Sequence, residues 1–251
     1  SLCSIMLRDS AHIQEFEAEW RNRKAKRTGA ELYVPLYTMQ EALGAIDLFV
    51  PHPYDQIETL CPGIQIRFVD AGHLLGSSSI EIWLTEQDTQ RKLVFSGDIG
   101  NYDQPLLRDP QYLTEADYVV MESTYGNRLH DKPKAYEPAL AEILESTFAK
   151  GGSVIIPSFA VGRTQEMLYF LKRVKEAHLV KTCPDFPVYV DSPLAIEATE
   201  IFQKNQKSCF DEEAMEYVRR GENPIGVSNL HVAVTSDASR AINFDTSCKV
   251  I

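Results

Sequence analysis

The chain has 251 residues, 44% of them hydrophobic and 24% charged, which is typical of a soluble globular protein with one large domain or two ordinary ones. It holds no apolar run as long as a membrane-spanning helix and no recognisable signal peptide, so the sequence argues against membrane partners. The formal net charge of −11 counts against nucleic acid as a partner without excluding it, because a bound metal offsets the carboxylates at its own site.

The five cysteines are scattered along the chain and are never spaced as C-x-x-C. This spacing argues against a disulfide framework and against a cysteine zinc site. It favours a reducing compartment, so a cytoplasmic protein is expected, or a nuclear one in a eukaryote.

The first predicted elements are a strand and two helices. A continuous apolar run over residues 2–7 predicts a strand. Helices are predicted over residues 10–27 and 38–50, where Gly29 ends the first and a capping box at Thr38 begins the second. The first helix is expected to bury one apolar stripe, which consists of Ile13, Phe16 and Trp20.

The hydrophobic period then changes from that of a helix to two. Residues 64–68 and 80–84 alternate between apolar and polar side chains, which predicts half-buried strands. Residues 92–96 and 118–121 form shorter and more continuous apolar strands. This part of the chain is therefore expected to form a sheet.

Strands and helices alternate in the last hundred residues. Helices are predicted over 138–150, 164–177, 195–203, 211–220 and near Ser239, and strands over 154–156, 188–190, 231–234 and 248–251. This alternation predicts a doubly wound parallel sheet. A polar stretch before the first of these helices predicts a domain boundary that separates residues 1–130 from 131–251.

Single metal-binding side chains follow two of the predicted strands. His73 lies in a loop of small residues, and Asp98 follows the strand at 92–96. Each has an ordinary explanation, a histidine bonded to a loop carbonyl or an Asx-turn. If the two strands end at one edge of a sheet, the side chains meet, and the pair suits zinc, or manganese as second choice. Two ligands are too few for a catalytic zinc, which needs at least three from protein.

Two further carboxylates belong to this group of loops. Glu122 ends the strand at 118–121 and is interpreted either as an acid that orients a histidine or assists proton transfer, or as a cap of the following turn. Asp70, which precedes the His73 loop, is a second candidate for orienting a metal ligand.

A turn between a strand and a helix is a candidate phosphate site. Its free N–H groups, with Ser158, Arg163 and Thr164, suit an anion, although the turn lacks the G-K-[ST] ending of a P-loop. Asp191 and Ser192 end the next strand, at the edge where doubly wound sheets bind ligands. A capped helix start, with Arg163 in a structural pair, is a serious competing explanation of the turn.

Several motifs occur together and in order along nearly the whole chain. They are DAGHLLGS at 70–77, FSGDIG at 95–100, ESTYG at 122–126, IPSFAVGRTQE at 156–166 and VDSPLA at 190–195. Together they resemble the metallo-β-lactamase fold nucleases of the β-CASP group. That group includes the endonuclease subunit of the cleavage and polyadenylation factor and its bacterial and archaeal relatives.

The resemblance implies an α/β protein with a partial metallo-β-lactamase αββα sandwich and a doubly wound parallel-sheet β-CASP domain. It also implies hydrolysis of phosphodiester bonds in single-stranded RNA by two zinc ions. By this resemblance, His73 matches a ligand of one zinc, Asp98 matches the aspartate that bridges both, and Glu122 matches an acid that supports a later histidine. The implied partners are RNA and either a second copy of the protein or an RNA-processing complex.

The sequence departs from the family pattern in one respect, because no His-x-His-x-Asp-His occurs in it. The expected place of that motif is upstream of Leu2, and that of the later histidines is beyond Ile251. An interior portion of a longer enzyme is therefore expected, which alone binds zinc weakly and does not cleave RNA. Two other functions stay open, a non-catalytic scaffold in an RNA-processing complex and a hydrolase of small esters or thioesters.

Overall fold

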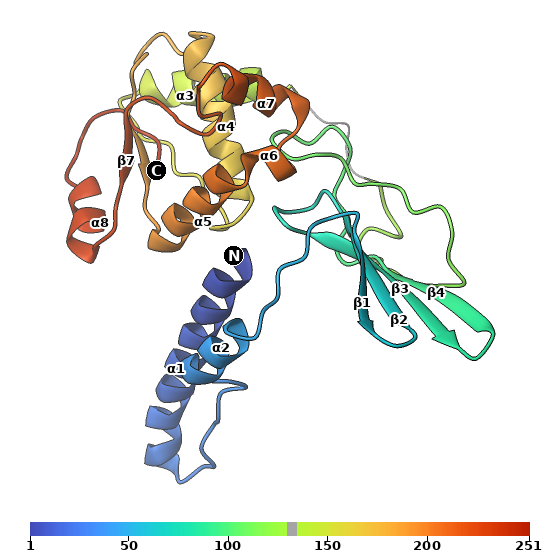
Figure 1. Ribbon diagram of the computed structural model, residues 1–251. Coiled ribbons are helices and arrows are strands. Elements are labelled where there is room, and N and C mark those ends of the chain that lie inside the picture. Colours follow the sequence, from blue (N-terminus) through green and yellow to red (C-terminus); the bar gives the residue numbers. More distant parts are fainter. Residues whose placement is uncertain (130–134) are drawn as a thin grey trace. The chain divides into compact units, whose positions relative to one another are not determined.

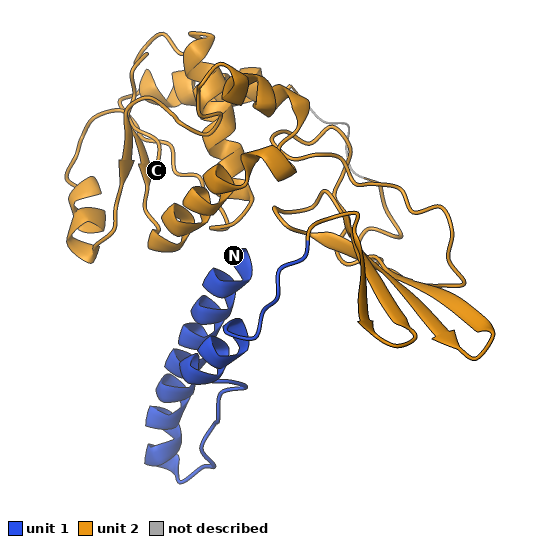
Figure 2. Ribbon diagram, in the orientation of Figure 1, with its two compact units in different colours: residues 1–52 blue, residues 53–251 orange. Residues whose placement is uncertain are grey.

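The computed structural model describes residues 1–129 and 135–251, so the domain boundary predicted at residues 130 and 131 lies outside the described residues. The chain divides into two compact units, Ser1–His52 and Pro53–Ile251, which Figure 2 shows in different colours. Within the described ranges, no helix is both long and apolar enough to span a membrane.

The first unit consists of helices α1 (Leu2–Thr28) and α2 (Met39–Ile46). The strand predicted over residues 2–7 is wrong, because Ser1 caps a helix that begins there. A short apolar run does not distinguish a strand from a helix by its period alone. Gly29 ends α1 as predicted, with a left-handed φ of 68°.

The apolar stripe predicted to be buried in α1 lies exposed. The segment that returns from α1 runs along the opposite face, where Leu36 donates its N–H to Gln14 Oε1 at 3.1 Å. That face buries the small side chains of Ala11 and Ala18 instead. The stripe residues, Ile13, Phe16 and Trp20, are 49% to 62% exposed.

The capping box predicted for α2 is present, since Thr38 accepts from the Glu41 N–H and the Glu41 carboxylate accepts from the Thr38 N–H. The helix ends at Ile46 rather than at residue 50. Leu48 and Val50 are 80% and 72% exposed, so no burial supports a further turn.

The second unit begins with a five-stranded mixed sheet in the order β1-β2-β3-β4-β5. Figure 1 labels the first four of these strands. Its strands are β1 (Ile57–Cys61), β2 (Ile64–Asp70), β3 (Ser78–Glu86), β4 (Thr89–Phe95) and β5 (Tyr118–Val120). The two strands predicted from the period of two and the two predicted from short apolar runs are confirmed, while the largely exposed β1 was not predicted.

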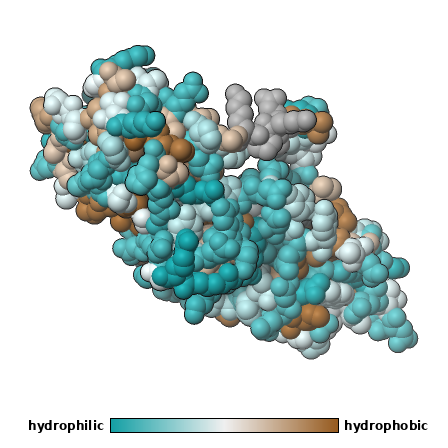
Figure 3. All heavy atoms as spheres, turned by 90° about the horizontal axis from the view of Figure 1, so that it is seen from above, coloured by the Kyte–Doolittle hydropathy of each residue, from teal (hydrophilic) through white to brown (hydrophobic). Residues whose placement is uncertain are grey.

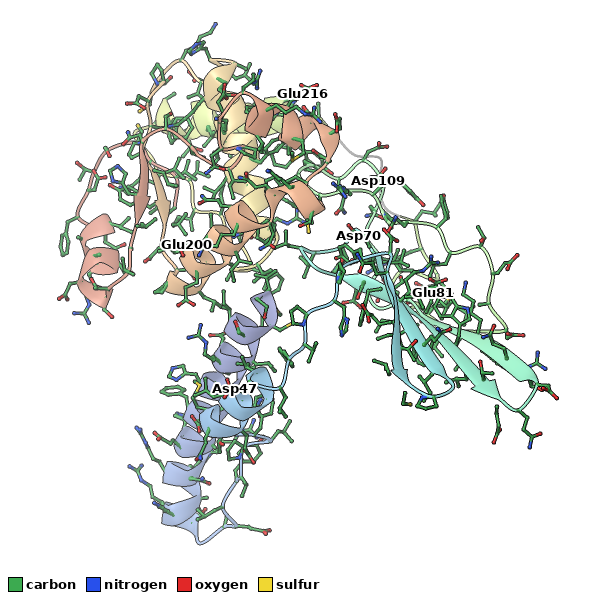
Figure 4. All side chains as sticks on the ribbon, viewed as in Figure 1. Asp47, Asp70, Glu81, Asp109, Glu200 and Glu216 are labelled. Atoms are coloured by element: carbon green, nitrogen blue, oxygen red, sulfur yellow. The ribbon has the colours of Figure 1, made fainter. Side chains whose placement is uncertain are left out.

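One face of this sheet holds a buried charge network around Glu81, which is labelled in Figure 4. The Glu81 side chain is fully buried between two cations, Lys92, with Nζ 2.5 Å from Oε1, and Arg67. Burial raises the pKa of Glu81, but the hydrogen bonds and charges of Arg67 and Lys92 outweigh it and leave the pKa below its ordinary value. The carboxylate therefore stays ionised inside the sheet.

A smaller parallel sheet follows, formed by β6 (Val188–Val190) and β7 (Leu230–Val232). Val250 forms parallel bridges to Val188 and to Val154. The strands predicted over residues 154–156 and 248–251 are therefore reduced to bridges at one residue each, Val154 and Val250. Among the described residues, segment 154–156 pairs on one side only, through Val154 and Val250, and Ile155 is 70% exposed. The α/β class predicted from the sequence is confirmed.

Helices surround the parallel sheet. They are α3 (Tyr136–Phe148), α4 (Arg163–Glu176), α5 (Pro193–Lys204), α6 (Gln206–Cys209), α7 (Glu212–Arg219) and α8 (Ser236–Ile242). Large side chains such as Tyr169, Phe186 and Phe202 are fully buried among them and form the core. Figure 3 shows a mostly hydrophilic face on which apolar residues gather in small separate groups.

Candidate active site

The loops that carry the predicted site residues leave one edge of the five-stranded sheet. Strands β2 and β4 both pair antiparallel with β3, and β5 pairs parallel with β4. The carboxyl ends of β2, β4 and β5 therefore lie at the same edge. The loops after these strands carry His73, Asp98 and Glu122, respectively.

Polar side chains fix the loop that presents His73. Asp70, labelled at the end of β2 in Figure 4, accepts the N–H of Gly72 on Oδ1 at 2.9 Å. Ser77 Oγ accepts the N–H of His73 at 3.0 Å. Gly72 has a φ of 61°, and a Cβ there would lie 2.5 Å from the Pro110 nitrogen. The loop conformation therefore requires glycine at this position, and Asp70 helps to fix the loop through its bond to Gly72.

The Asp98 loop is tied to both neighbouring loops. Gly100 donates its N–H to the carbonyl oxygen of Ala71 at 2.8 Å, in the loop that carries the histidine. Ile99 donates its N–H to Glu122 Oε1 at 2.7 Å. These two bonds hold the three loops in fixed register.

The structure brings His73 and Asp98 together, with His73 Nε2 4.0 Å from Asp98 Oδ2. The side chains are 43% and 76% exposed, so both are free to adjust. Two ligands about 2.0 to 2.2 Å from a tetrahedral zinc stand roughly 3.4 Å apart. A small side-chain rotation closes that difference, and the imidazole and carboxylate fit as two ligands of one ion.

Glu122 has a carboxyl pKa below its ordinary value. The hydrogen bond from the Ile99 N–H is the main cause, and the bonds from Thr124 and the charge of His73 add to it. Glu122 thus holds its own turn and also lies within electrostatic reach of His73. Both interpretations left open by the sequence agree with this geometry.

Glu166, in the first turn of α4, is a residue near this site that the sequence did not single out. Its carboxylate pairs with the Arg163 guanidinium at 2.7 Å, and its side chain is only 18% exposed. Burial raises the pKa of Glu166, against the opposing charges of Arg163 and His73. An acid in a helix's first turn ordinarily stabilises the helix dipole, so the sequence held no signal for this proximity.

The predicted substrate-binding residues separate into two groups. Arg163 is engaged with Glu166. The other four line a cavity of about 300 Å³ at the parallel sheet, and they are Ser158, Thr164, Asp191 and Ser192.

The N–H groups of the candidate phosphate turn are partly used within it. Gly162 donates its N–H to Gln165 Oε1 at 2.7 Å, and Thr164 donates both its N–H and its hydroxyl to the carbonyl of Phe159. Binding of a phosphate here would depend mainly on side chains such as Ser158.

Comparison with known proteins identifies the family. Residues 164–251 match the Beta-Casp domain. Over 206 residues the chain is 36% identical to Ribonuclease TTHA0252 of Thermus thermophilus, an alignment that covers 82% of this chain and 44% of that relative. This chain is a member of the β-CASP family.

Two other relatives of this β-CASP chain carry the names of a transcription termination factor and of a cleavage and polyadenylation factor subunit. The chain is 30% identical over 184 residues to Transcription termination factor FttA of Methanosarcina mazei, covering 70% of this chain and 27% of the relative. It is 32% identical over 147 residues to Cleavage and polyadenylation specificity factor subunit 3-I of Arabidopsis thaliana, covering 56% of this chain and 20% of the relative. The β-CASP chain therefore spans less than half of the length of each of these relatives.

The candidate metal ligands of this β-CASP chain are fewer than a catalytic zinc requires. Across residues 1–129 and 135–251, no three His, Cys, Asp or Glu side chains are grouped so that they could hold a metal ion. His73 and Asp98 would supply two donors of the three or more that a catalytic zinc takes from protein.

We expect Glu122→Gln to destabilise the β-CASP chain at neutral pH, and the difference to shrink in acid. The pKa of Glu122 is lower in the folded state than in the unfolded chain, where it is about 4.3. The ionised carboxylate therefore contributes fully to the free energy of unfolding above that pH, and this contribution is lost as the pH falls through the lowered pKa. Thermal unfolding of both chains from about pH 7 to about pH 3 measures this difference. Glu142→Gln on α3 serves as an exposed control, and a pH-independent difference for Glu122→Gln would contradict the assignment.

Ser192 has a structural role that is testable separately. Its Oγ accepts the N–H of Ala195 at 3.2 Å and caps α5. We expect Ser192→Ala to lower the free energy of unfolding by about 1 kcal/mol, and Ser192→Asp to retain most of it. Denaturant titration of the two variants measures the effect, and equal stability of Ser192→Ala and the unchanged chain would exclude the cap.

Proposed function

We propose that this chain is part of a zinc-dependent nuclease that hydrolyses phosphodiester bonds in single-stranded RNA. The observation that carries the proposal is the meeting of His73 and Asp98 at one sheet edge, beside Glu122. A nitrogen and an oxygen donor suit zinc, with manganese as second choice. A relative named as a ribonuclease supports RNA as the substrate.

The proposal gives each residue of this edge a role. His73 holds one of two zinc ions, and Asp98 bridges both. Zinc bound there supplies Lewis acidity toward a phosphoryl oxygen and lowers the pKa of a water molecule. Glu122, whose lowered pKa keeps it ionised at neutral pH, acts in catalysis by supporting a histidine from a later part of the protein.

The finer fold belongs to the same proposal, with a partial αββα sandwich in residues 1–130 and a doubly wound β-CASP domain in residues 131–251. The register places one set of apolar side chains on a single face of the five-stranded sheet. Leu84, Phe95, Tyr118 and Val120 on this face are 37% to 60% exposed. A second sheet packed there would bury them.

The parallel sheet is proposed to contact the RNA. Its strand ends lie at the edge where doubly wound sheets bind ligands. The residues proposed for this contact are Ser158, Arg163, Thr164, Asp191 and Ser192. A homodimer or an RNA-processing complex in the cytoplasm, or in the nucleus of a eukaryote, is the proposed setting, with no membrane partner.

The test uses the whole protein that carries this chain and a labelled single-stranded RNA. Cleavage that a chelator abolishes and zinc restores is the expected result. RNA binding without cleavage would instead identify a scaffold, and hydrolysis of a thioester without RNA cleavage would identify a small-substrate hydrolase. The 251-residue chain alone is the matched control, and it is expected to bind zinc weakly and leave the RNA intact.

A further inference from the structure

The start of α4 lies directly against the His73 loop. Gly162 precedes the first residue of α4 and is buried. A Cβ on Gly162 would lie 2.5 Å from Cδ2 of Leu74, the residue after His73. This close approach places the first turn of α4, within which the Beta-Casp match begins, beside the proposed zinc ligand.

Glu166 projects from that turn with unused hydrogen-bonding capacity. Its Oε2 pairs with Arg163, while Oε1 makes no hydrogen bond with any residue that the structure describes. The side chain is largely buried and interacts electrostatically with the His73 imidazole. A shielded carboxylate near an imidazole attracts a ring N–H more strongly than it would in water.

Three other carboxylates near His73 already have a partner or a proposed role. Asp70 accepts the N–H of Gly72. Asp98 is 76% exposed and is proposed as a metal ligand itself. Glu122 accepts from the Ile99 N–H and from Thr124. A histidine that binds a metal through one ring nitrogen usually donates its other N–H to a carboxylate or carbonyl, which fixes the ring. Glu166 keeps one carboxylate oxygen, Oε1, without a hydrogen bond among the described residues, and is available for that task.

We propose that Glu166 is a positioning residue. Its carboxylate orients the imidazole of His73 toward Asp98. The contact of Gly162 with Leu74 sets the position of Glu166. The metal-related part of this inference rests on the proposed function, whereas the orientation of His73 does not. On this account the β-CASP segment helps to build the catalytic edge and does more than bind substrate.

A purely structural role for Glu166 predicts different behaviour. In that case the acid stabilises the start of α4 and pairs with Arg163, and the orientation of the His73 ring does not depend on it. Arg163→Met removes the ion pair but keeps the carboxylate, whereas Glu166→Gln removes the charge at constant size. The two variants therefore separate helix stabilisation from an effect on His73.

The first experiment measures the ring ¹⁵N signals of His73 by NMR in the 251-residue chain, without metal or RNA. We expect Glu166→Gln to shift them, Glu166→Asp to restore part of the shift, and Glu142→Gln to leave them unchanged. Arg163→Met is expected to shift them less than Glu166→Gln. Signals that are unchanged in Glu166→Gln, or an equal shift in Arg163→Met, would overturn the positioning role.

The second experiment measures zinc affinity of the whole protein by competition with a chromophoric chelator. We expect Glu166→Gln to weaken zinc binding about 10- to 100-fold, as for loss of a residue that orients a metal ligand. A change below twofold would overturn the role of Glu166 toward the metal. A His73 shift in a protein that cleaves no RNA would keep the positioning role and overturn the proposed function. Unchanged His73 signals in a protein that cleaves RNA would overturn the positioning role and keep the proposed function.

Discussion

Replacing Asp98 by asparagine is expected to lower kcat/KM for single-stranded RNA by at least about 100- to 1000-fold in the whole protein. That range is the usual cost of removing one group that stabilises charge in a transition state. The amide keeps the size of the side chain but removes the charge proposed to bridge two cations. Because the side chain is 76% exposed, the melting temperature is expected to stay unchanged.

Asp88→Asn is the matched control for this prediction. Asp88 lies in the turn between β3 and β4, at the opposite edge of the sheet, and is exposed. Its replacement is expected to leave both cleavage and stability as they were. Cleavage by Asp98→Asn at a rate close to that of the unchanged protein would exclude Asp98 from the metal site.

Gly100→Ala is expected to destabilise the second unit by about 3 kcal/mol or more, the upper end of the cost of overpacking. A Cβ on Gly100 would lie 1.9 Å from the carbonyl oxygen of Gly72 and 2.3 Å from its carbonyl carbon. Both are backbone atoms, so the two loops must separate and lose the bond from the Gly100 N–H to Ala71. Denaturant unfolding and the His73 NMR signals together measure the effect.

Gly44→Ala provides the contrast. Gly44 lies within α2, and a Cβ there would meet no atom within 4 Å. Alanine is therefore expected to stabilise that helix by roughly 0.5 to 1 kcal/mol. If Gly100→Ala is as stable as Gly44→Ala, the close contact between the His73 and Asp98 loops is wrong.

The sequence predicted those parts of the fold that depend on local pattern. Strands β2 and β3 follow the alternation of apolar and polar residues, and α2 begins at its capping box. The buried face of α1 could not be predicted, because it depends on the returning segment that Gln14 fixes through Leu36. A strong apolar stripe pointed to Phe16 and Trp20, but a partner far along the chain selected Ala11 and Ala18.

In the candidate site, too, local pattern predicted some features, whereas others depend on contacts between distant parts of the chain. Strand direction allowed His73 and Asp98 to be expected near each other, and the structure places them 4.0 Å apart. Their roles in metal binding stay predictions. Glu166 was not predicted because its proximity to His73 arises from the packing of Gly162 on Leu74, two residues from separate parts of the chain. No local pattern encodes that contact.

The most direct measurement of the central claim is anomalous diffraction at the zinc absorption edge from crystals of the whole protein. The account predicts two zinc peaks at the carboxyl edge of β2 and β4, with Asp98 between them and His73 bound to one. Zinc peaks that contact neither His73 nor Asp98, in a protein that cleaves RNA, would contradict it.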